Sequence, residues 1–201
     1  MLNTNDELKI ISAIDLKKKL EEMEVQKKIQ QFEKHLSSFD EQPHYFLVLA
    51  NLKLQINDLK GALHYLNIAC SLFPKVELIY DIRAKALYDL KDYNGALMNI
   101  NQAIALNPEK ESYYYRRGNI LLHLKVYSRA EDDYSKAIEM NSSKDCYFFK
   151  RAIARGYLHN LENSIADFEK TIELNPNKVK AREAILNFKR RLALRNQNPK
   201  I

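Results

Sequence analysis

The sequence repeats itself four times at a constant period, which is the interval from Pro74 to Pro108. Pro74, Pro108 and Pro176 stand at the same place in three of the copies, and Ser142 takes that place in the other one. Two further columns hold small residues, which are Ala62, Ala96, Ala130 and Ser164 in one and Ala69, Ala103, Ala137 and Thr171 in the other. No insertion or deletion interrupts the period across residues 43–178. A constant period in this range is typical of stacked supersecondary units that bury their apolar surfaces against one another.

Each copy is predicted to form two helices joined by a short turn. In the second copy, apolar residues recur every three or four positions, which places them on one face of a helix. The first helix is expected to use Leu78, Tyr80, Ala84 and Leu87, and the second helix Ala96, Leu97, Ile100, Ala103 and Ile104. Small residues in this set let neighbouring helices approach closely, and a larger side chain there would cost about 1–3 kcal/mol.

The ends of the second helices are also predictable. Proline lacks a backbone N–H and disfavours helix at the residue before it, so the three prolines of the repeats should end these helices. Ser128 and Glu131 are expected to form a capping box at the start of the second helix in the third copy. The acidic run at residues 131–133 is interpreted as a solvated face.

The repeated columns resemble those of the tetratricopeptide repeat family over residues 43–178. The family has a bulky residue at the fourth position of the repeat, and this chain has Phe46, Tyr80, Tyr114 and Phe148. The eighth position is small, and here it holds Ala50, Ala84, Gly118 and Ala152. The twenty-fourth position is apolar or aromatic, and here it holds Leu66, Ile100, Tyr134 and Phe168. The resemblance implies an all-α fold, a right-handed α-solenoid of tandem helix-turn-helix repeats with flanking helices. The four repeats are predicted at residues 43–76, 77–110, 111–144 and 145–178, between an N-terminal helical extension at 1–42 and a basic capping helix and tail at 179–201.

Two columns of basic residues depart from or extend this pattern. Lys53 and Arg155 stand at the eleventh position, where the family has an apolar residue, so packing is expected to be looser there. Arginines recur at the seventh position of three copies, where the family often carries arginine; they are Arg83, Arg117 and Arg151. We interpret these three as packing through their aliphatic stems and not as ligand-binding residues.

The N-terminal extension is predicted to be a helix with two apolar faces. Val25, Ile29, Phe32 and Leu36 form one stripe, and Leu16, Leu20 and Met23 form another on the opposite side. Phe39 lies one full period before Phe73, which indicates a degenerate half repeat, although Lys28 and His35 occupy its small positions. One hypothesis is that both stripes pack on the repeats, or even fill their groove. The other is that one stripe meets a partner or a second copy of the chain.

The C-terminal segment is predicted to be a helix that covers the last repeat. Residues 179–195 carry Ala181, Ile185, Phe188 and Leu192 at the spacing of one helix face. Residues 177–201 have a net charge of +7, whereas the rest of the chain has a net charge of −1. The positive net charge of +6 for the whole chain therefore comes from this segment. Among its eight basic residues, the candidates for a binding surface are Arg182, Lys189, Arg190 and Arg191, with Lys178 before them. They are expected either to be solvated on a polar outer face or to contact nucleic acid or another acidic surface.

The resemblance also implies a binding groove. In the family, the first helices line the concave side of the solenoid, and the second, fifth, sixth, ninth, twelfth and thirteenth positions face the groove. The residues predicted to bind there are Asn51, Lys85, Tyr88, Tyr115, Arg116, Asn119, Phe149, Lys150 and Tyr157. Aromatic side chains offer contact area, the two asparagines can pair with a peptide backbone, and Arg116 and Lys150 can meet a carboxylate. An extended peptide or a helix of another protein is the predicted partner.

Co-chaperones of the family hold the C-terminal carboxylate of heat-shock chaperones with five residues. These are lysine and asparagine in one repeat, asparagine in the next, and lysine and arginine in the third. At these positions the chain has Leu47, Asn51, Ile82, Ser112 and Arg116. Two of the five match, so the sequence argues against a chaperone-tail adaptor.

The sequence contains no motif for catalysis. It lacks a Gly-rich phosphate loop, paired histidines with an intervening glutamate, and a CxxC motif, so no enzyme activity, cofactor or metal is predicted. Cys70 and Cys146 are expected to be reduced thiols. No apolar run suits a membrane span or a signal peptide, and a cytoplasmic location is predicted.

Overall fold

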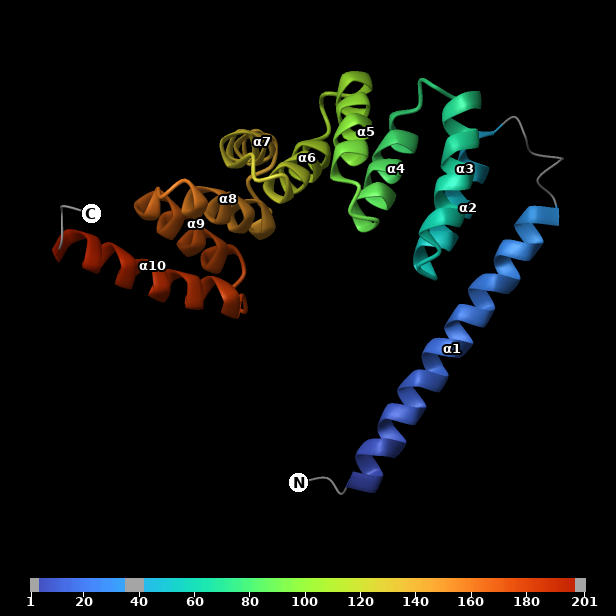
Figure 1. The fold of residues 1–201 in the computed structure, drawn as a ribbon, viewed down its shortest axis with the longest axis horizontal. Helices are drawn as coiled ribbons and strands as arrows, with labels where there is room; N and C mark the ends of the chain where they lie inside the picture. The colour runs from blue at the N-terminus through green and yellow to red at the C-terminus, as the bar shows by residue number, and fades with distance from the viewer. Residues whose placement is uncertain (1–3, 35–41, 198–201) are drawn as a thin grey trace. The chain divides into compact units, whose positions relative to one another are not determined.

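The computed structural model describes residues 4–34 and 42–197, with side chains described for residues 18–34 and 42–195. Within these ranges the chain forms ten helices and no strand (Figure 1). The helices are α1 (Thr4–Lys34), α2 (Pro43–Gln55), α3 (Leu59–Leu72), α4 (Glu77–Asp89), α5 (Tyr93–Leu106), α6 (Glu111–His123), α7 (Tyr127–Met140), α8 (Asp145–Tyr157), α9 (Leu161–Leu174) and α10 (Val179–Gln197). The predicted all-α fold is therefore confirmed.

The helices between α1 and α10 form four consecutive pairs that keep the sequence period. The first members, α2, α4, α6 and α8, begin one full period apart, and the second members follow the same spacing. The chain divides into two compact units, Met1–Leu90 and Lys91–Ile201. We call them the N-terminal unit, with α1 to α4, and the C-terminal unit, with α5 to α10.

A residue with a left-handed backbone closes the turn inside each repeat. Asn57, Lys91, Lys125 and His159 have φ angles of 60° to 64° and follow one another at the repeat period. Asparagine adopts this conformation more readily than most residues other than glycine, whereas lysine rarely does. The turns at Lys91 and Lys125 therefore hold a residue that is unfavourable for its own backbone.

Aspartate caps the second helices of the first two repeats. The Oδ1 atom of Asp58 accepts a hydrogen bond from the backbone N–H of Gly61, and Asp92 accepts one from Gly95, each at 2.9 Å. A Cβ atom on either glycine would lie 2.3 Å from the capping carboxylate. A side chain at either glycine would therefore have to displace the capping carboxylate from its present position.

The predicted capping box of the third repeat is wrong. Helix α7 begins at Tyr127, its N-cap residue is Val126, and no side chain caps it. The repeat period places Val126 where the first two repeats have aspartate, so Ser128 lies inside the helix.

The second helices end where the repeated prolines predict. Helices α3, α5 and α9 each stop two residues before a proline. Helix α7 stops in the same register although Ser142 replaces the proline. The Oδ1 atoms of Asn107, Asn141 and Asn175 accept the N–H two residues later, at 3.2, 3.1 and 3.2 Å. This local asparagine turn explains why α7 ends without proline.

The small-residue columns are buried, as predicted. All eight residues named for the two columns are fully buried. The two polar members are hydrogen-bonded, since the hydroxyl of Ser164 donates to the Ala152 carbonyl at 2.7 Å and that of Thr171 to the Asp167 carbonyl at 2.9 Å. A Cβ atom on Gly118 would lie 2.6 Å from the ring of Tyr134. Gly118 is small because α6 and α7 nearly touch there.

The apolar face expected for α4 is only partly right. Leu78 is 38% exposed, whereas Ile79, Ile82 and Ala86 are buried in the core that α1 to α4 share. A first helix packs against more than one neighbour, so its buried residues spread over more than the single stripe that the spacing indicates.

Helix α1 packs on the first repeat through the predicted stripe. Val25 and Ile29 are buried, and Phe32 packs on the same core, with its ring 5.1 Å from that of Tyr45. Leu36, His35 and Phe39 lie outside the described residues, as does the side chain of Leu16. Leu20 and Met23 of the other stripe are 54% and 62% exposed. In the described part of α1, one face is therefore buried and the opposite face is uncovered.

Lys53 shows how the chain accommodates a charge at the eleventh position. Its Nζ lies 3.9 Å from Glu33 of α1 and 3.4 Å from Asp58. Glu33 also accepts a 2.6 Å hydrogen bond from the Tyr65 hydroxyl. The expected loosening is thus replaced by a small polar network.

Candidate binding groove

The predicted groove residues of the N-terminal unit lie on α2 and α4. Asn51 of α2 and Lys85 of α4 are exposed, and Tyr88 of α4 is half-buried. These side chains are accessible to a partner. The other six predicted groove residues belong to α6 and α8 of the C-terminal unit.

Tyr115 and Asn119 of α6 are held within the protein. The Tyr115 ring lies 4.8 Å from that of Tyr147 and 6.0 Å from that of Tyr134. The Tyr134 hydroxyl donates to Asn119 Oδ1 at 3.0 Å. Burial raises the pKa of Tyr115, while a side-chain hydrogen bond with Asn119 acts in the opposite direction. Asn119, predicted to pair with a peptide backbone, is therefore engaged by two tyrosines, and Arg116 beside it is half-buried.

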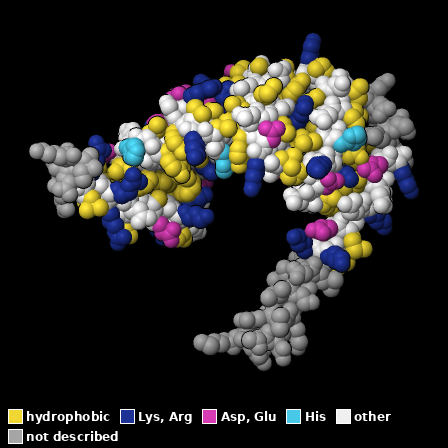
Figure 2. Space-filling view, in the orientation of Figure 1, with side chains coloured by type: hydrophobic (Ala, Val, Ile, Leu, Met, Phe, Trp, Pro, Cys, Tyr) yellow, Lys and Arg dark blue, Asp and Glu magenta, His cyan; other side chains and the backbone are white. Residues whose placement is uncertain are grey.

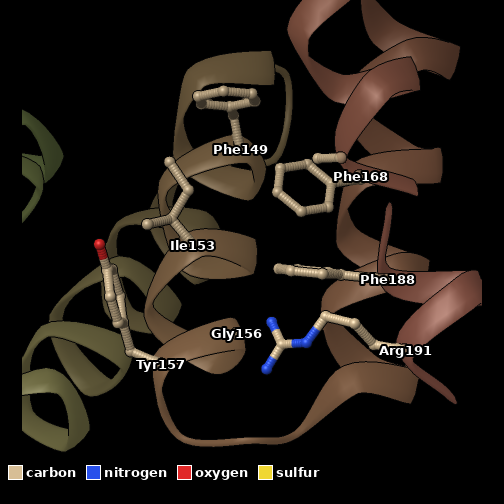
Figure 3. A pocket seen from close by; sticks show the side chains of 8 residues that line it. Phe149, Ile153, Gly156, Tyr157, Phe168, Phe188 and Arg191 are labelled. Atoms are coloured by element: carbon tan, nitrogen blue, oxygen red, sulfur yellow. The ribbon is translucent and has the colours of Figure 1, made fainter. Parts of the chain in front are cut away.

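Phe149 and Tyr157 line an apolar cavity of about 380 Å³ (Figure 3). Helix α8 contributes Ile153 and Gly156 as well, and the remaining walls are Phe168 of α9 and Ala184, Phe188 and Arg191 of α10. The Phe168 ring lies 5.5 Å from that of Phe149 and 5.8 Å from that of Phe188. The cavity thus lies between the first helix of the last repeat and the C-terminal helix.

Gly156 lets α10 approach α8 at this cavity. A Cβ atom on Gly156 would lie 2.7 Å from the Phe188 ring, well inside van der Waals contact. The guanidinium of Arg191 stacks over the same ring, 5.4 Å from its centre. Arg191, predicted only as part of the basic tail, is therefore part of the cavity. Its position one full period after Tyr157 is the sequence signal that could have identified it.

Lys178 places a positive charge beside Phe149 at the cavity. Lys178 Nζ bonds to Asp145 at 3.1 Å and lies 5.4 Å from the centre of the Phe149 ring. Burial favours a higher pKa for Asp145, but hydrogen bonds from Lys178 and Asn175 and the charge of Lys178 outweigh it, so the pKa is lowered. Burial and, to a lesser degree, Lys178 lower the pKa of Lys150. Among the described residues, no carboxylate pairs with Lys150.

Two of the three seventh-position arginines form ion pairs, so the interpretation that they pack only through their stems is incomplete, whereas Arg83 donates a hydrogen bond to Cys70 Sγ at 3.2 Å. Arg117 makes two hydrogen bonds to Asp133, at 2.8 and 2.7 Å, and Arg151 makes two to Asp167, at 2.9 and 2.8 Å. Both aspartates are buried. The guanidiniums also lie over the rings of Tyr114 and Phe148, each at 5.6 Å. The same separation between arginine and aspartate in both pairs was the sequence signal for this contact.

Arg155 joins the same network. It bonds to Asp167 at 2.8 Å and to Glu131 at 2.7 Å, so the looser packing expected at this eleventh position is replaced by ion pairs. The interpretation of residues 131–133 as a solvated face is wrong for Glu131 and Asp133, because arginines of α6 and α8 bind them. Asp132 between them is exposed.

The basic residues of α10 do not act as one uniform patch. Arg182 donates to the Pro176 carbonyl at 2.6 Å, and Lys189 bonds to Glu169 at 3.1 Å. Arg190 is exposed, and Arg191 stacks at the cavity. Contact of this helix with nucleic acid stays a prediction.

The described residues contain neither a metal-binding cluster nor a candidate membrane-spanning helix. There, no three His, Cys, Asp or Glu side chains come together in a way that could hold a metal ion. Over the same residues, none of the helices combines the length and apolar character that crossing a membrane requires.

Known proteins with this architecture support the repeat assignment. A crystal structure of MamA has a TM-score of 0.72 and 20% identity, over 81% of this chain and 95% of that one. A crystal structure of YrrB, described as a TPR protein with an unusual peptide-binding site, has a TM-score of 0.70 and 16% identity, over 88% and 87%. The first TPR of Spaghetti (RPAP3), bound to an HSP90 peptide, has a TM-score of 0.57 and 24% identity, over 58% and 93%. These structures share the fold of this chain.

Comparison by sequence matches a shorter part of the chain than comparison by structure. No curated protein matches the chain in sequence. Residues 83–145, which span parts of the second and fourth repeats and the whole third repeat, match the model of the tetratricopeptide repeat family. The same columns and helix boundaries continue at a fixed period through all four copies. Residues 83–145 therefore belong to the tetratricopeptide repeat family, and the chain has an all-α solenoid fold.

Proposed function

We propose that the chain is a non-catalytic protein-interaction module that binds an extended peptide or a helix of another protein. The observation that carries this proposal is the apolar cavity at the predicted groove positions Phe149 and Tyr157. Concave apolar sites with a few polar groups are the usual binding sites of proteins. In this proposal, one apolar side chain of the partner enters the cavity between α8 and α10.

The charges beside the cavity favour an acidic partner. Lys150 is half-buried and has no carboxylate partner among the described residues. Arg191 is a cation in the cavity wall itself. A partner carboxylate next to the inserted apolar side chain would offset the cost of keeping these charges in place.

A heat-shock chaperone tail is not the proposed partner. The chain has Leu47, Ile82 and Ser112 where the carboxylate clamp of the family has lysine, asparagine and lysine. The Spaghetti domain was solved with an HSP90 peptide, and YrrB is described as having an unusual peptide-binding site. The fold therefore serves more than one mode of peptide recognition, and the residues of this chain favour a mode other than the clamp.

Peptide selection tests the proposal. Phage-displayed random peptides are selected on the full chain, and their affinities are then measured for wild type, Ile153→Glu and Lys150→Glu. We expect selected peptides to combine an apolar residue with acidic neighbours and to lose about tenfold or more in affinity for both variants, which is about 1.4 kcal/mol. Met98→Glu is the matched control, because Met98 is an apolar residue of the same unit that is 74% exposed. Equal binding to wild type and Ile153→Glu would refute the cavity as the site.

A further inference from the structure

A second hollow adjoins the apolar cavity of the C-terminal unit. Its volume is about 530 Å³, and it is lined by Leu158 and His159 of the turn between α8 and α9, Leu161 of α9, and Arg191 and Arg195 of α10. We call it the basic hollow. Arg191 lines both the cavity and the basic hollow, so the two spaces meet at its side chain. Figure 2 shows basic side chains next to hydrophobic surface over α8 to α10.

The basic hollow carries positive charge that the described part of the protein does not neutralise. No Asp or Glu side chain lines the hollow, and no carboxylate among the described residues bonds to Arg191 or Arg195. The hollow also reaches the first residue of α9, a helix whose N-cap residue Asn160 makes no side-chain capping bond. The positive end of this helix adds to the potential of the two arginines. The hollow therefore favours an anionic group.

The cavity and the basic hollow can be filled by one small occupant. Figure 3 shows the guanidinium of Arg191 on the side of the Phe188 ring away from Phe168, next to Gly156 near the end of α8. The end of the cavity that borders the basic hollow is therefore the end at Arg191. An occupant of both spaces needs an apolar group and a negative charge that only a few bonds separate.

We propose that this site binds the C-terminal residue of a partner protein, an inference that rests on the proposed function. The apolar side chain of that residue enters the cavity, and its α-carboxylate bonds to Arg191 and Arg195 in the basic hollow. Both groups are attached to the same Cα atom, so a single residue fills both spaces. In an extended internal segment, neighbouring side chains point to opposite sides. An acidic residue next to the inserted one would therefore direct its carboxylate away from the arginines.

The site is separate from the carboxylate clamp of the co-chaperones. The clamp positions belong to the first three repeats, whereas the basic hollow is formed by the turn between α8 and α9 together with α10. The residue that enters the cavity also differs in kind. Phe149, Phe168 and Phe188 form part of the cavity wall, so the C-terminal residue of the partner should be bulky and apolar.

A chemical change in the peptide tests this proposal without a mutation. Random peptides displayed with a free C-terminus are selected on the full chain, and the tightest binder is synthesised as the free acid and as the C-terminal amide. Selected peptides should end in a bulky apolar residue. Amidation should weaken binding to wild type by about tenfold or more, because it removes the charge that the arginines bind. Adding a glycine after the last residue should weaken binding to a similar extent.

Two variants locate the carboxylate on the protein. Arg195→Gln should weaken binding of the free acid by about fivefold or more and leave the affinity for the amide unchanged. Arg190→Gln is the matched control, because Arg190 is an exposed arginine of the same helix that lines neither hollow. It should bind both peptides as wild type does.

The outcomes separate this proposal from the proposed function. If acid and amide bind equally but Ile153→Glu loses both, an internal segment enters the cavity; the C-terminal residue is then excluded, while the proposed function stands. If Ile153→Glu binds both peptides as wild type does, the cavity is not the site and both proposals fail. An equal loss of acid binding in Arg190→Gln and Arg195→Gln would also overturn the C-terminal site, because it would indicate general attraction to a basic helix.

Discussion

Asp167 is predicted to be the most sensitive charged residue of the C-terminal unit. It is 4% exposed and accepts three hydrogen bonds, from Arg151 Nε and Nη2 at 2.9 and 2.8 Å and from Arg155 Nη1 at 2.8 Å. Removing one partner of a buried ion pair costs about 3–5 kcal/mol, because the other charge stays buried without compensation. The side chains of Arg151 and Arg155 are 16% and 18% exposed, so water can recover part of this cost. We therefore expect Asp167→Ala to lower the free energy of unfolding by about 3 kcal/mol.

Two comparisons make this prediction specific. Asp133 binds only one arginine among the described residues, Arg117, so Asp133→Ala should cost less than Asp167→Ala. Asp132 is exposed on α7, and Asp132→Ala should stay within about 0.5 kcal/mol of wild type. The order of the three variants follows from burial and from the number of bonds that each aspartate accepts.

Urea unfolding followed by far-UV circular dichroism gives the shift in midpoint. Repeat proteins often unfold in stages, because each repeat contacts only its neighbours. Hydrogen exchange of α8 and α9 should therefore accompany the unfolding curves, and these two helices should lose protection first in Asp167→Ala. If Asp167→Ala costs less than about 1 kcal/mol, or less than Asp133→Ala, the network does not have the role that its geometry indicates.

Three further predictions concern single positions. Replacing Lys125 or His159 with glycine should raise the unfolding free energy by about 0.5–1 kcal/mol in urea, since each has a positive φ of 61°; no gain would show that these turns are unstrained. Gly156→Ala should cost about 1–3 kcal/mol and increase hydrogen exchange in α10, because the new methyl group would press on Phe188; wild-type exchange rates would contradict this. Burial raises the pKa of Tyr147 to about 12, so the unfolded chain, with a tyrosine pKa near 10, loses its proton first as pH rises. Stability should therefore fall between pH 10 and 12 by about 2 kcal/mol more in wild type than in Tyr147→Phe, and equal pH profiles of the two chains would refute this.

The helical hairpins could be read from the sequence because their determinants are local. The prolines at the helix ends, the small residues between paired helices and the apolar spacing all act within one repeat or between neighbours. The capping box of the third repeat failed at the same level of detail, because Ser128 stands two residues beyond the position that caps in other repeats. Propensity identified a suitable residue type, but only the register within the turn decides which side chain reaches the free N–H groups.

The candidate site was only partly predictable. Phe149 and Tyr157 were predicted from the groove positions that the family resemblance implies, and both line the cavity. Arg191 was assigned to a basic tail because lysines and arginines cluster in that sequence, whereas in the structure its guanidinium stacks on Phe188. The difference arises because the place of α10 depends on how closely it approaches Gly156, which no local pattern reports.

The sequence by itself determined the repeat period, the ends of the second helices and which residues had to be small, since a strict period leaves one consistent arrangement of helix pairs. Only the tertiary structure decided which charges meet. Arg155 bonds to residues 12 and 24 positions away, Asp167 and Glu131, and helix α1 buries one of its two apolar faces while leaving Leu20 exposed. These outcomes depend on the angle and depth at which helices dock. Side-chain packing sets both, and several neighbouring helices contribute to it at once.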